Sequence, residues 1–172
     1  MNLDAITDFA NSASDEIARY SFQVTISPER LQNTDFIVDE LQWDSINYGD
    51  AEIERVPDDK RGVYAFAIAH ENQVLPPHGY ILYIGIAGRR SRRSIRARYR
   101  DYLNEKKILE RARIARMIGH WSHVLRFYFA PVNDDLSSED LEKIETQLNT
   151  ALLPPFSEGD VEADVKKKRR AF

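Results

Sequence analysis

The 172-residue chain has no cysteine, and it has no apolar run near the roughly 20 residues that a membrane-spanning helix needs. The missing cysteines exclude disulfides, thiolate metal sites and cysteine nucleophiles. The first residues are acidic and amphipathic, which is unlike a secretory signal peptide. With 42% hydrophobic and 30% charged residues, the composition is ordinary for a globular protein. We therefore expect a cytoplasmic protein without membrane attachment, built around one modest core.

Several common enzyme signatures are also missing. The four histidines, at positions 70, 78, 120 and 123, do not have the spacing of an H-E-x-x-H metal site. The chain contains no Ser-His-Asp ordering, no Walker loop and no dinucleotide-binding fingerprint. We therefore set aside the enzyme classes that depend on these motifs.

The net charge of −4 conceals a strong asymmetry along the chain. Residues 1–60 hold 14 acidic and 4 basic residues, whereas residues 61–130 hold 4 acidic and 14 basic ones. A middle segment with a net charge of +10 is typical of a surface that binds a polyanion. The alternative is a solvated surface balanced by the acidic N-terminal segment, because charge counts do not show clustering in space.

The periodicity of apolar residues divides the chain into three parts. Residues 2–20 have helical spacing, residues 21–26 alternate as in a half-buried strand, and turn-forming residues follow at 56–60. The last residues, 158–172, have no apolar pattern and end in a basic run. We predict an N-terminal α/β extension over 1–55, a main domain over 56–157 and a flexible basic tail over 158–172.

The main domain is predicted to contain both strands and helices. Strands are expected at 62–69, 80–84 and 123–130, and the first two form a long-looped antiparallel hairpin. Helices are expected from Ser94 to about residue 107, over 108–118, and after the capping-box pair Ser137 and Asp140. The last helix ends before a proline pair at 154–155. These elements predict an α+β fold.

Two short motifs occur on the predicted hairpin, GVY at Gly62–Tyr64 and YIG at Tyr83–Gly85. Neighbouring strands lie about 4.8 Å apart, so Tyr64 and Tyr83 can bring their hydroxyls together if they share a face of the sheet. Tyrosine is also frequent in strands as a core residue, and spacing alone does not separate the two interpretations.

Arginine is concentrated between residues 89 and 100. Arg98 and Tyr102 are four residues apart, which places them on one face of the predicted helix. A guanidinium stays ionised and binds phosphate with two parallel hydrogen bonds, which suits the charge of a phosphoryl transition state. The other members of the run are Arg89, Arg90, Arg92, Arg93, Arg96 and Arg100. They serve either as surface charge or as contacts to nucleic-acid phosphates, and we favour the second interpretation.

Glu145 interrupts the apolar stripe of the final helix, between Leu141 and Leu148. An ionised carboxylate on a buried face is unfavourable unless it is paired or bound to a cation. A hard oxygen ligand of this kind suits Mg²⁺, which takes one or two protein carboxylates and keeps several waters. The alternative is that Glu145 lies at the edge of the stripe and reaches solvent or a basic side chain.

Taken in order, the two tripeptides, the Arg98–Tyr102 pair and Glu145 before two prolines resemble the GIY-YIG nuclease domain. The resemblance covers roughly residues 57–157 and leaves the first 55 residues unexplained. It implies a small three-stranded antiparallel sheet flanked by helices, in agreement with the strands predicted above. It also implies hydrolysis of DNA phosphodiesters to 5′-phosphate and 3′-hydroxyl ends, with one Mg²⁺ or Mn²⁺ held by Glu145.

The resemblance also implies a role for each of the other site residues. Tyr64 would be the general base, Tyr83 would position the water or the phosphate, and Arg98 would stabilise the transition state. Tyr102 would lie near the scissile group. Because the usual pKa of tyrosine is about 10, a nearby cation would have to lower that of Tyr64.

Two positions differ from the usual pattern of the family. Ser157 stands where the family often has an asparagine, and Ile86 follows YIG where a lysine or a small polar residue is frequent. These differences motivate a second hypothesis, a nucleic-acid-binding module that keeps the fold and has lost efficient catalysis. A third hypothesis concerns the acidic residues 1–55, which bind a protein partner or cover the basic middle segment.

Overall fold

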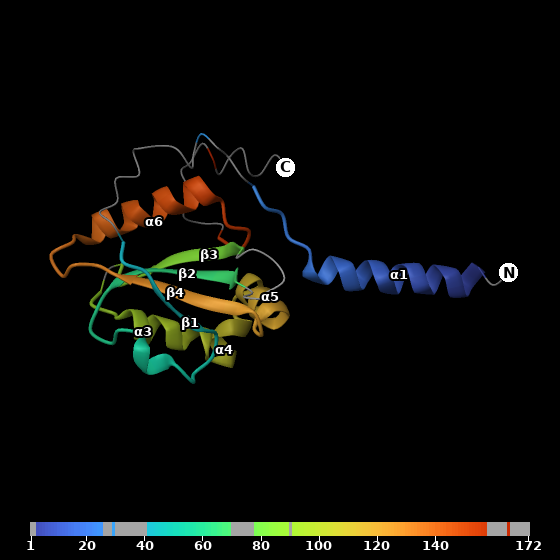
Figure 1. The fold of residues 1–172 in the computed structure, drawn as a ribbon, viewed down its shortest axis with the longest axis horizontal. Helices are drawn as coiled ribbons and strands as arrows, with labels where there is room; N and C mark the ends of the chain where they lie inside the picture. Colours follow the sequence, from blue (N-terminus) through green and yellow to red (C-terminus); the bar gives the residue numbers. More distant parts are fainter. Residues whose placement is uncertain are drawn as a thin grey trace.

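An antiparallel sheet of four strands separates two layers of helices (Figure 1). The computed structural model describes residues 3–25, 29, 41–69, 78–89, 91–157 and 165. Helix α6 (Ser138–Leu152) covers one face of the sheet. The other face is covered by α3 (Ile95–Tyr99), α4 (Glu105–Leu109) and α5 (Ala112–Trp121). This arrangement confirms the predicted α+β fold.

The strands are β1 (Asp44–Asn47), β2 (Gly62–Ala69), β3 (Gly79–Ala87) and β4 (Leu125–Pro131), in the spatial order β1-β4-β2-β3. The predicted hairpin of β2 and β3 is confirmed. The predicted number of strands was wrong by one, because β1 adds to the edge of β4. Only Ile46 of β1 is buried, so this four-residue strand has too little alternation to be recognised in the sequence.

Strand β3 also continues further than its apolar pattern suggests. The prediction ended at residue 84 because Gly85 was expected to break the strand, whereas Gly85 pairs with Tyr64 inside the ladder. The strand ends at Ala87, and the next residue, Gly88, has a φ of +89°, a conformation that favours glycine. The whole YIG motif therefore lies within a regular strand.

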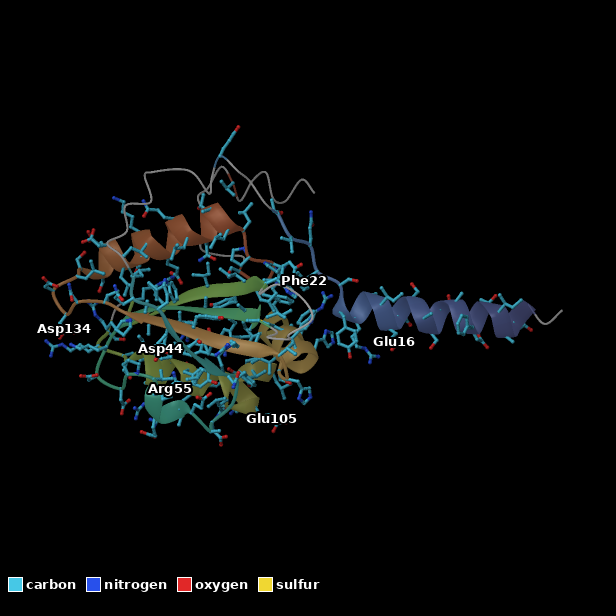
Figure 2. The ribbon with its side chains drawn as sticks, viewed as in Figure 1. Glu16, Phe22, Asp44, Arg55, Glu105 and Asp134 are labelled. Carbon is cyan, nitrogen blue, oxygen red and sulfur yellow. The ribbon has the colours of Figure 1, made fainter. Side chains whose placement is uncertain are left out.

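The N-terminal segment consists of α1 (Leu3–Tyr20), which confirms the predicted helix, followed by residues 21–25 without regular structure. The strand predicted over 21–26 was wrong for its described part. Phe22 instead packs edge-on against Trp121, with ring centroids 5.4 Å apart, at the junction between α1 and the sheet (Figure 2). Helix α1 extends away from the sheet (Figure 1), and its apolar residues Ile6 and Phe9 are exposed.

The predicted helix from Ser94 to residue 107 is divided into three pieces. Its start is confirmed, since the Ser94 side chain accepts a hydrogen bond from the backbone N–H of Ala97. A 3₁₀ turn, η2 (Arg100–Tyr102), follows α3, and Asn104 then begins α4 by accepting from the N–H of Lys107. Asparagine is a preferred N-cap residue, which is why the helix restarts there. As a consequence, the second predicted helix is displaced to Ala112–Trp121.

The core forms on both faces of the sheet because successive residues of β2 point to opposite sides. On the α3 side, aromatic residues dominate, including Tyr64 and Phe66. On the α6 side, Val63 and Ala65 pack with aliphatic residues of β3 and with Leu141. Tyr64 is thereby assigned to the layer that contains α3.

The described residues contain no helix long and apolar enough to cross a membrane. The predicted loop at 70–79 and the predicted tail at 158–172 lie almost wholly outside the described residues. Residues 44–47, predicted as part of the N-terminal extension, belong to the same sheet as β2–β4. Beside this strand, Arg55 pairs with Asp44 at 3.0 Å and with Glu52 at 2.6 Å (Figure 2).

Candidate active site

The register of the hairpin brings the two motif tyrosines onto one face of the sheet. Tyr64 lies opposite Gly85, and Phe66 lies opposite Tyr83, so Tyr64 and Tyr83 are diagonal neighbours with stacked rings 6.2 Å apart. A Cβ atom at Gly85 would lie 2.6 Å from the Tyr64 hydroxyl oxygen. The glycine of YIG is therefore required to make room for the Tyr64 ring.

Helix α3 and the turn η2 add Arg98 and Tyr102 to the same cluster. The hydroxyls of Tyr64 and Tyr102 share a hydrogen bond of 2.7 Å, and Arg98 Nε donates to the Tyr64 hydroxyl at 3.1 Å. The guanidinium carbon of Arg98 lies 5.6 Å from the centroid of the Tyr102 ring, within the range of a cation–π contact. Tyr102 and Tyr83 have ring centroids 6.2 Å apart. Four of the residues predicted for the site therefore meet.

Burial controls the acidity of these tyrosines. Tyr64 is 0% exposed, and this desolvation raises its pKa well above the usual value. The neighbouring Tyr102 and Tyr83 raise it further, whereas Arg98 opposes the shift only in part. Burial likewise raises the pKa of Tyr83. Arg98 alone thus does not produce the lowered pKa that a general base at position 64 needs.

Arg98 stays ionised in this environment. The Tyr64 hydroxyl is the largest influence that raises the pKa of the guanidinium, and partial burial opposes it. The side chain is 30% exposed, so it is reachable from solvent. Its Nε is bonded to Tyr64, and its Nη1 lies 3.3 Å from Asp101 Oδ2. The remaining Nη2 is the donor that a phosphate oxygen can use.

Asp101 is a site residue that the sequence analysis missed. Its residue surface is only 5% exposed, and its carboxylate accepts from Lys107 at 2.5 Å and from Arg93 at 2.7 Å, in addition to Arg98. Burial by itself would raise the pKa of Asp101, but the hydrogen bonds from Lys107 and Arg93 outweigh it and lower the pKa. One signal was available in the sequence, because Asp101 is the only acidic residue between positions 89 and 104.

Glu145 comes from the opposite layer. Helix α6 buries it to 3% exposure, and its carboxylate forms an ion pair with Arg89, in the segment after β3. The burial of Glu145 agrees with a place within the apolar stripe, and its ion pair agrees with the basic partner named in the alternative. Binding of a metal cation stays a prediction. Burial and Tyr102 are the main causes of the raised Tyr83 pKa, and the Glu145 charge also raises it. The carboxylate therefore lies within electrostatic range of the tyrosine cluster.

The two layers meet around β3, which is an edge strand of the sheet. Tyr83 and Gly85 of this strand belong to the α3 side, whereas Ile84 and Ile86 pack on the α6 side. A phosphate beside Tyr83 and Gly85 of β3 would have the arginine–tyrosine cluster on one side and α6 on the other. This part of β3 is the candidate active site.

The carboxylates of α6 fit a divalent cation by their chemistry. Glu142 is three residues before Glu145, and its Oε1 lies 3.9 Å from Arg89 Nε, so both carboxylates converge on one positive group. Such hard oxygen ligands suit Mg²⁺ or Mn²⁺. In the part of the chain that the structure describes, no group of three or more His, Asp or Glu residues could hold a metal. A cation here would take one or two carboxylates and complete its shell with water and phosphate oxygens.

The arginines predicted for DNA binding have different surroundings. Arg96 donates from Nε to the backbone carbonyl of Val56 at 2.7 Å and pairs with Glu54 at 2.8 Å, so it joins α3 to the segment before β2. Arg89 and Arg93 are paired with the carboxylates described above. These three side chains therefore have structural partners already.

The other three arginines predicted for DNA binding are Arg90, Arg92 and Arg100. Arg92 and Arg100 are exposed, and within the described ranges neither has an ion-pair partner. Arg90 lies outside the described residues. For all six arginines, contact with DNA stays a prediction.

Ser157 is buried against the edge of β3 that does not pair with β2. The backbone N–H of Ile84 donates to Ser157 Oγ at 3.0 Å, and Ser157 Oγ lies 3.4 Å from the Ile84 carbonyl oxygen. The backbone N–H of Phe156 donates to the Leu82 carbonyl at 2.9 Å. Ser157 thus helps to cover the edge of β3, and its predicted part in catalysis stays a prediction.

Comparisons of the chain with protein-family models, curated proteins and solved structures found no match. The resemblance to the GIY-YIG domain therefore stays a prediction from the sequence motifs.

Proposed function

We propose that the protein is a metal-dependent DNA endonuclease of the GIY-YIG type, which hydrolyses phosphodiesters to 5′-phosphate and 3′-hydroxyl ends. The observation that carries the proposal is the hydrogen-bonded cluster of Arg98, Tyr64 and Tyr102. Tyr83 extends this cluster along an edge strand, and the buried carboxylate of Glu145 lies within electrostatic range. An ionised guanidinium, phenol hydroxyls and a hard carboxylate are suited to phosphoryl chemistry.

Arg98 has the main electrostatic role in the proposed reaction. Negative charge grows on the phosphate oxygens as water attacks, and Arg98 Nη2, which has no hydrogen-bond partner among the described residues, is available to that charge. Such a preorganised donor contributes about 10²- to 10³-fold in rate. Because Nε and Nη1 are already bonded to Tyr64 and Asp101, the guanidinium does not have to reorient during the reaction.

The tyrosines have separate roles in this proposal. Tyr64 is fully buried, with its hydroxyl bonded to both Tyr102 and Arg98, so it orients the guanidinium as a neutral phenol. Tyr83 is only partly buried and is the better placed to hold the attacking water or the phosphate. When bound at Glu145, a divalent cation supplies charge stabilisation and a more acidic water.

The test is incubation of purified protein with supercoiled plasmid, with and without Mg²⁺ or Mn²⁺. We expect metal-dependent nicking or cutting that Arg98→Ala and Glu145→Ala abolish. Arg100→Ala is the matched control, because this exposed arginine lies two residues from Arg98 and should change affinity more than turnover. Ligation of the products without prior phosphorylation would verify the 5′-phosphate. If both Arg98→Ala and Glu145→Ala left cleavage intact, the proposal would fail.

A second candidate function is DNA binding without efficient turnover. Two observations favour it, namely the hydroxyl of Tyr64, which is buried and bonded to both Tyr102 and Arg98, and the ion pair that Arg89 forms with Glu145. This candidate predicts salt-sensitive DNA binding, since each phosphate contact releases counterions. Multiple turnovers at low enzyme concentration would exclude it, and binding without cleavage under all metal conditions would support it.

A further inference from the structure

The carboxylate of Asp101 divides its contacts unequally between its two oxygens. Oδ1 accepts from both Arg93 and Lys107, whereas the hydrogen bond that reaches Oδ2 comes from Arg98 Nη1. The carboxylate is almost completely buried, so these charged hydrogen bonds are little weakened by water. One oxygen is thus held in place by two cations while the other receives the guanidinium that the proposed reaction uses.

The Arg98 guanidinium is held at two separate nitrogens. Nε donates to the Tyr64 hydroxyl, and Nη1 lies 3.3 Å from Asp101. A single contact would leave the planar group free to rotate about its long side chain, whereas two contacts fix its plane. The orientation of the remaining Nη2 therefore depends on Asp101 as well as on Tyr64.

Asp101 also offsets repulsion among the basic groups around it. Arg111 lies with its guanidinium carbon 4.6 Å from the centroid of the Tyr102 ring, close to Arg98 on the same ring. Its Nη2 also donates to the backbone carbonyl of Asp101 at 3.3 Å. Three cations, Arg93, Arg98 and Lys107, thus contact the carboxylate, and Arg111 contacts the backbone of the same residue. Without that negative charge, they would repel one another in a partly buried region.

From these contacts we infer that Asp101 is a positioning residue, which orients the Arg98 guanidinium towards the scissile phosphate. Its catalytic consequence rests on the proposed nuclease function, whereas the contact itself is a property of the fold. Two effects of Asp101→Asn should then oppose each other. Turnover should fall about 10- to 100-fold, which is the usual loss when a group that orients a metal-binding side chain is removed. DNA affinity at low salt should stay the same or rise, because the surface gains one positive charge.

The first measurement is steady-state cleavage by Asp101→Asn, with kcat and DNA affinity determined separately. Asp134→Asn is the matched control, since it removes the same charge from an exposed aspartate that pairs with Lys60. We expect kcat to fall in Asp101→Asn alone, without a loss of affinity. Parallel losses of kcat and affinity, in proportion to unfolded protein, would show a merely structural role and overturn the inference.

The second measurement does not depend on cleavage. The Nε–H resonance of Arg98, assigned by its loss in Arg98→Lys, should be protected from solvent exchange in the wild type because Nε donates to Tyr64. Asp101→Asn should weaken that protection at least several-fold, and Asp134→Asn should not. Unchanged protection in Asp101→Asn would overturn the inference. If the wild type cleaves no DNA, the nuclease proposal fails, while this resonance still decides the role of Asp101.

Asp101→Glu provides a variant that keeps the charge. The longer side chain still neutralises Arg93 and Lys107, so the fold is maintained, but its carboxylate is displaced by one methylene. We expect its kcat and its Arg98 protection to lie between those of the wild type and Asp101→Asn. Wild-type values for both would mean that the position of the carboxylate is irrelevant, which contradicts the inference.

Discussion

Asp101 and Glu145 are both buried carboxylates near the edge strand, yet their surroundings differ. Asp101 lies in the α3 layer among Arg93, Arg98 and Lys107. Glu145 lies in the α6 layer, and the ion pair that reaches it comes from Arg89, a side chain that is 45% exposed. The partners of Asp101 lie within eight residues of it along the chain, whereas Arg89 lies 56 residues from Glu145.

This difference separates two uses of a buried charge. A carboxylate with several charged partners can hold other side chains in place, because its desolvation is offset by charged hydrogen bonds. A buried carboxylate whose arginine partner is half-exposed can bind a metal cation in place of that arginine. We therefore assign orientation of Arg98 to Asp101 and the proposed metal to Glu145.

The largest expected effect comes from Glu145→Gln, which keeps the shape of the side chain and removes its charge. Metal-dependent cleavage should fall by at least about 10²- to 10³-fold, because the proposed cation loses its main ligand. Cleavage rates over a range of Mg²⁺ concentrations measure this effect. Glu142→Gln is the control and should lose much less. Equal activity of Glu145→Gln and the wild type would contradict the distinction between the two carboxylates.

A smaller effect is expected when the partner of Glu145 is removed. Arg89→Gln removes a half-exposed cation from the buried carboxylate of Glu145, which should lower the free energy of unfolding by about 1–3 kcal/mol. Mg²⁺ or Mn²⁺ should raise the melting temperature of this variant more than that of the wild type. Thermal unfolding with and without metal gives the comparison. An equal metal-induced shift in both proteins would show that Arg89 and the cation do not compete.

The lowered pKa of Asp101 predicts how stability depends on pH. The pKa of aspartate is about 3.9 in an unfolded chain, and the pKa of Asp101 is lower in the folded protein. The folded protein therefore stabilises the ionised form of Asp101 more than the unfolded chain does, and this difference adds to the free energy of unfolding. This stabilisation is fully present above about pH 4 and is lost as the pH falls through the folded pKa. Asp101→Asn should therefore flatten the acid limb of the unfolding profile, measured by urea titration between pH 2 and 6. An unchanged acid limb would contradict the assigned charge contacts.

The smallest expected effect concerns one member of the group around Asp101. Lys107→Gln removes a half-exposed cation from Oδ1 while Arg93 stays in place, so the loss of stability should be about 0.5–1 kcal/mol. Turnover should change less than in Asp101→Asn, because Oδ2 still faces Arg98. Denaturant unfolding and cleavage assays measure both quantities, with exposed Lys106→Gln as the control. A loss of turnover as large as that of Asp101→Asn would mean that the cations around Asp101 act as one unit.

Much of the fold could be predicted from local patterns. The hairpin of β2 and β3, strand β4 and the caps at Ser94 and Ser137 follow from residues close together in the sequence. Strand β1 could not be predicted, because its four residues are polar apart from one and become a strand only by pairing with β4. The division of the helix after Ser94 also escaped prediction, since its apolar spacing continues through the break at Asn104.

The candidate site was predictable only in part. Its tyrosines and Arg98 were found by motif order, but the pairing of Arg89 with Glu145 joins positions 56 residues apart and has no local signal. Ser157 was predicted to take part in catalysis, which stays a prediction. Its hydroxyl accepts a hydrogen bond from the backbone of Ile84, 73 residues away, and this contact has no local signal in the sequence. The acidic residues 1–55 were predicted to bind a protein partner or to cover the basic middle segment. Helix α1 extends away from the sheet (Figure 1). Binding of a partner by this segment stays a prediction.

The sequence by itself determined the alternation of β2, the glycines of the hairpin and the order of the chemically active residues, because these depend on neighbours along the chain. Only the tertiary structure decided which charges meet. It directed Arg89 to Glu145 and Arg96 to the segment before β2. The physical reason is that a buried charge must find a partner wherever the fold brings one, and sequence distance does not limit that choice.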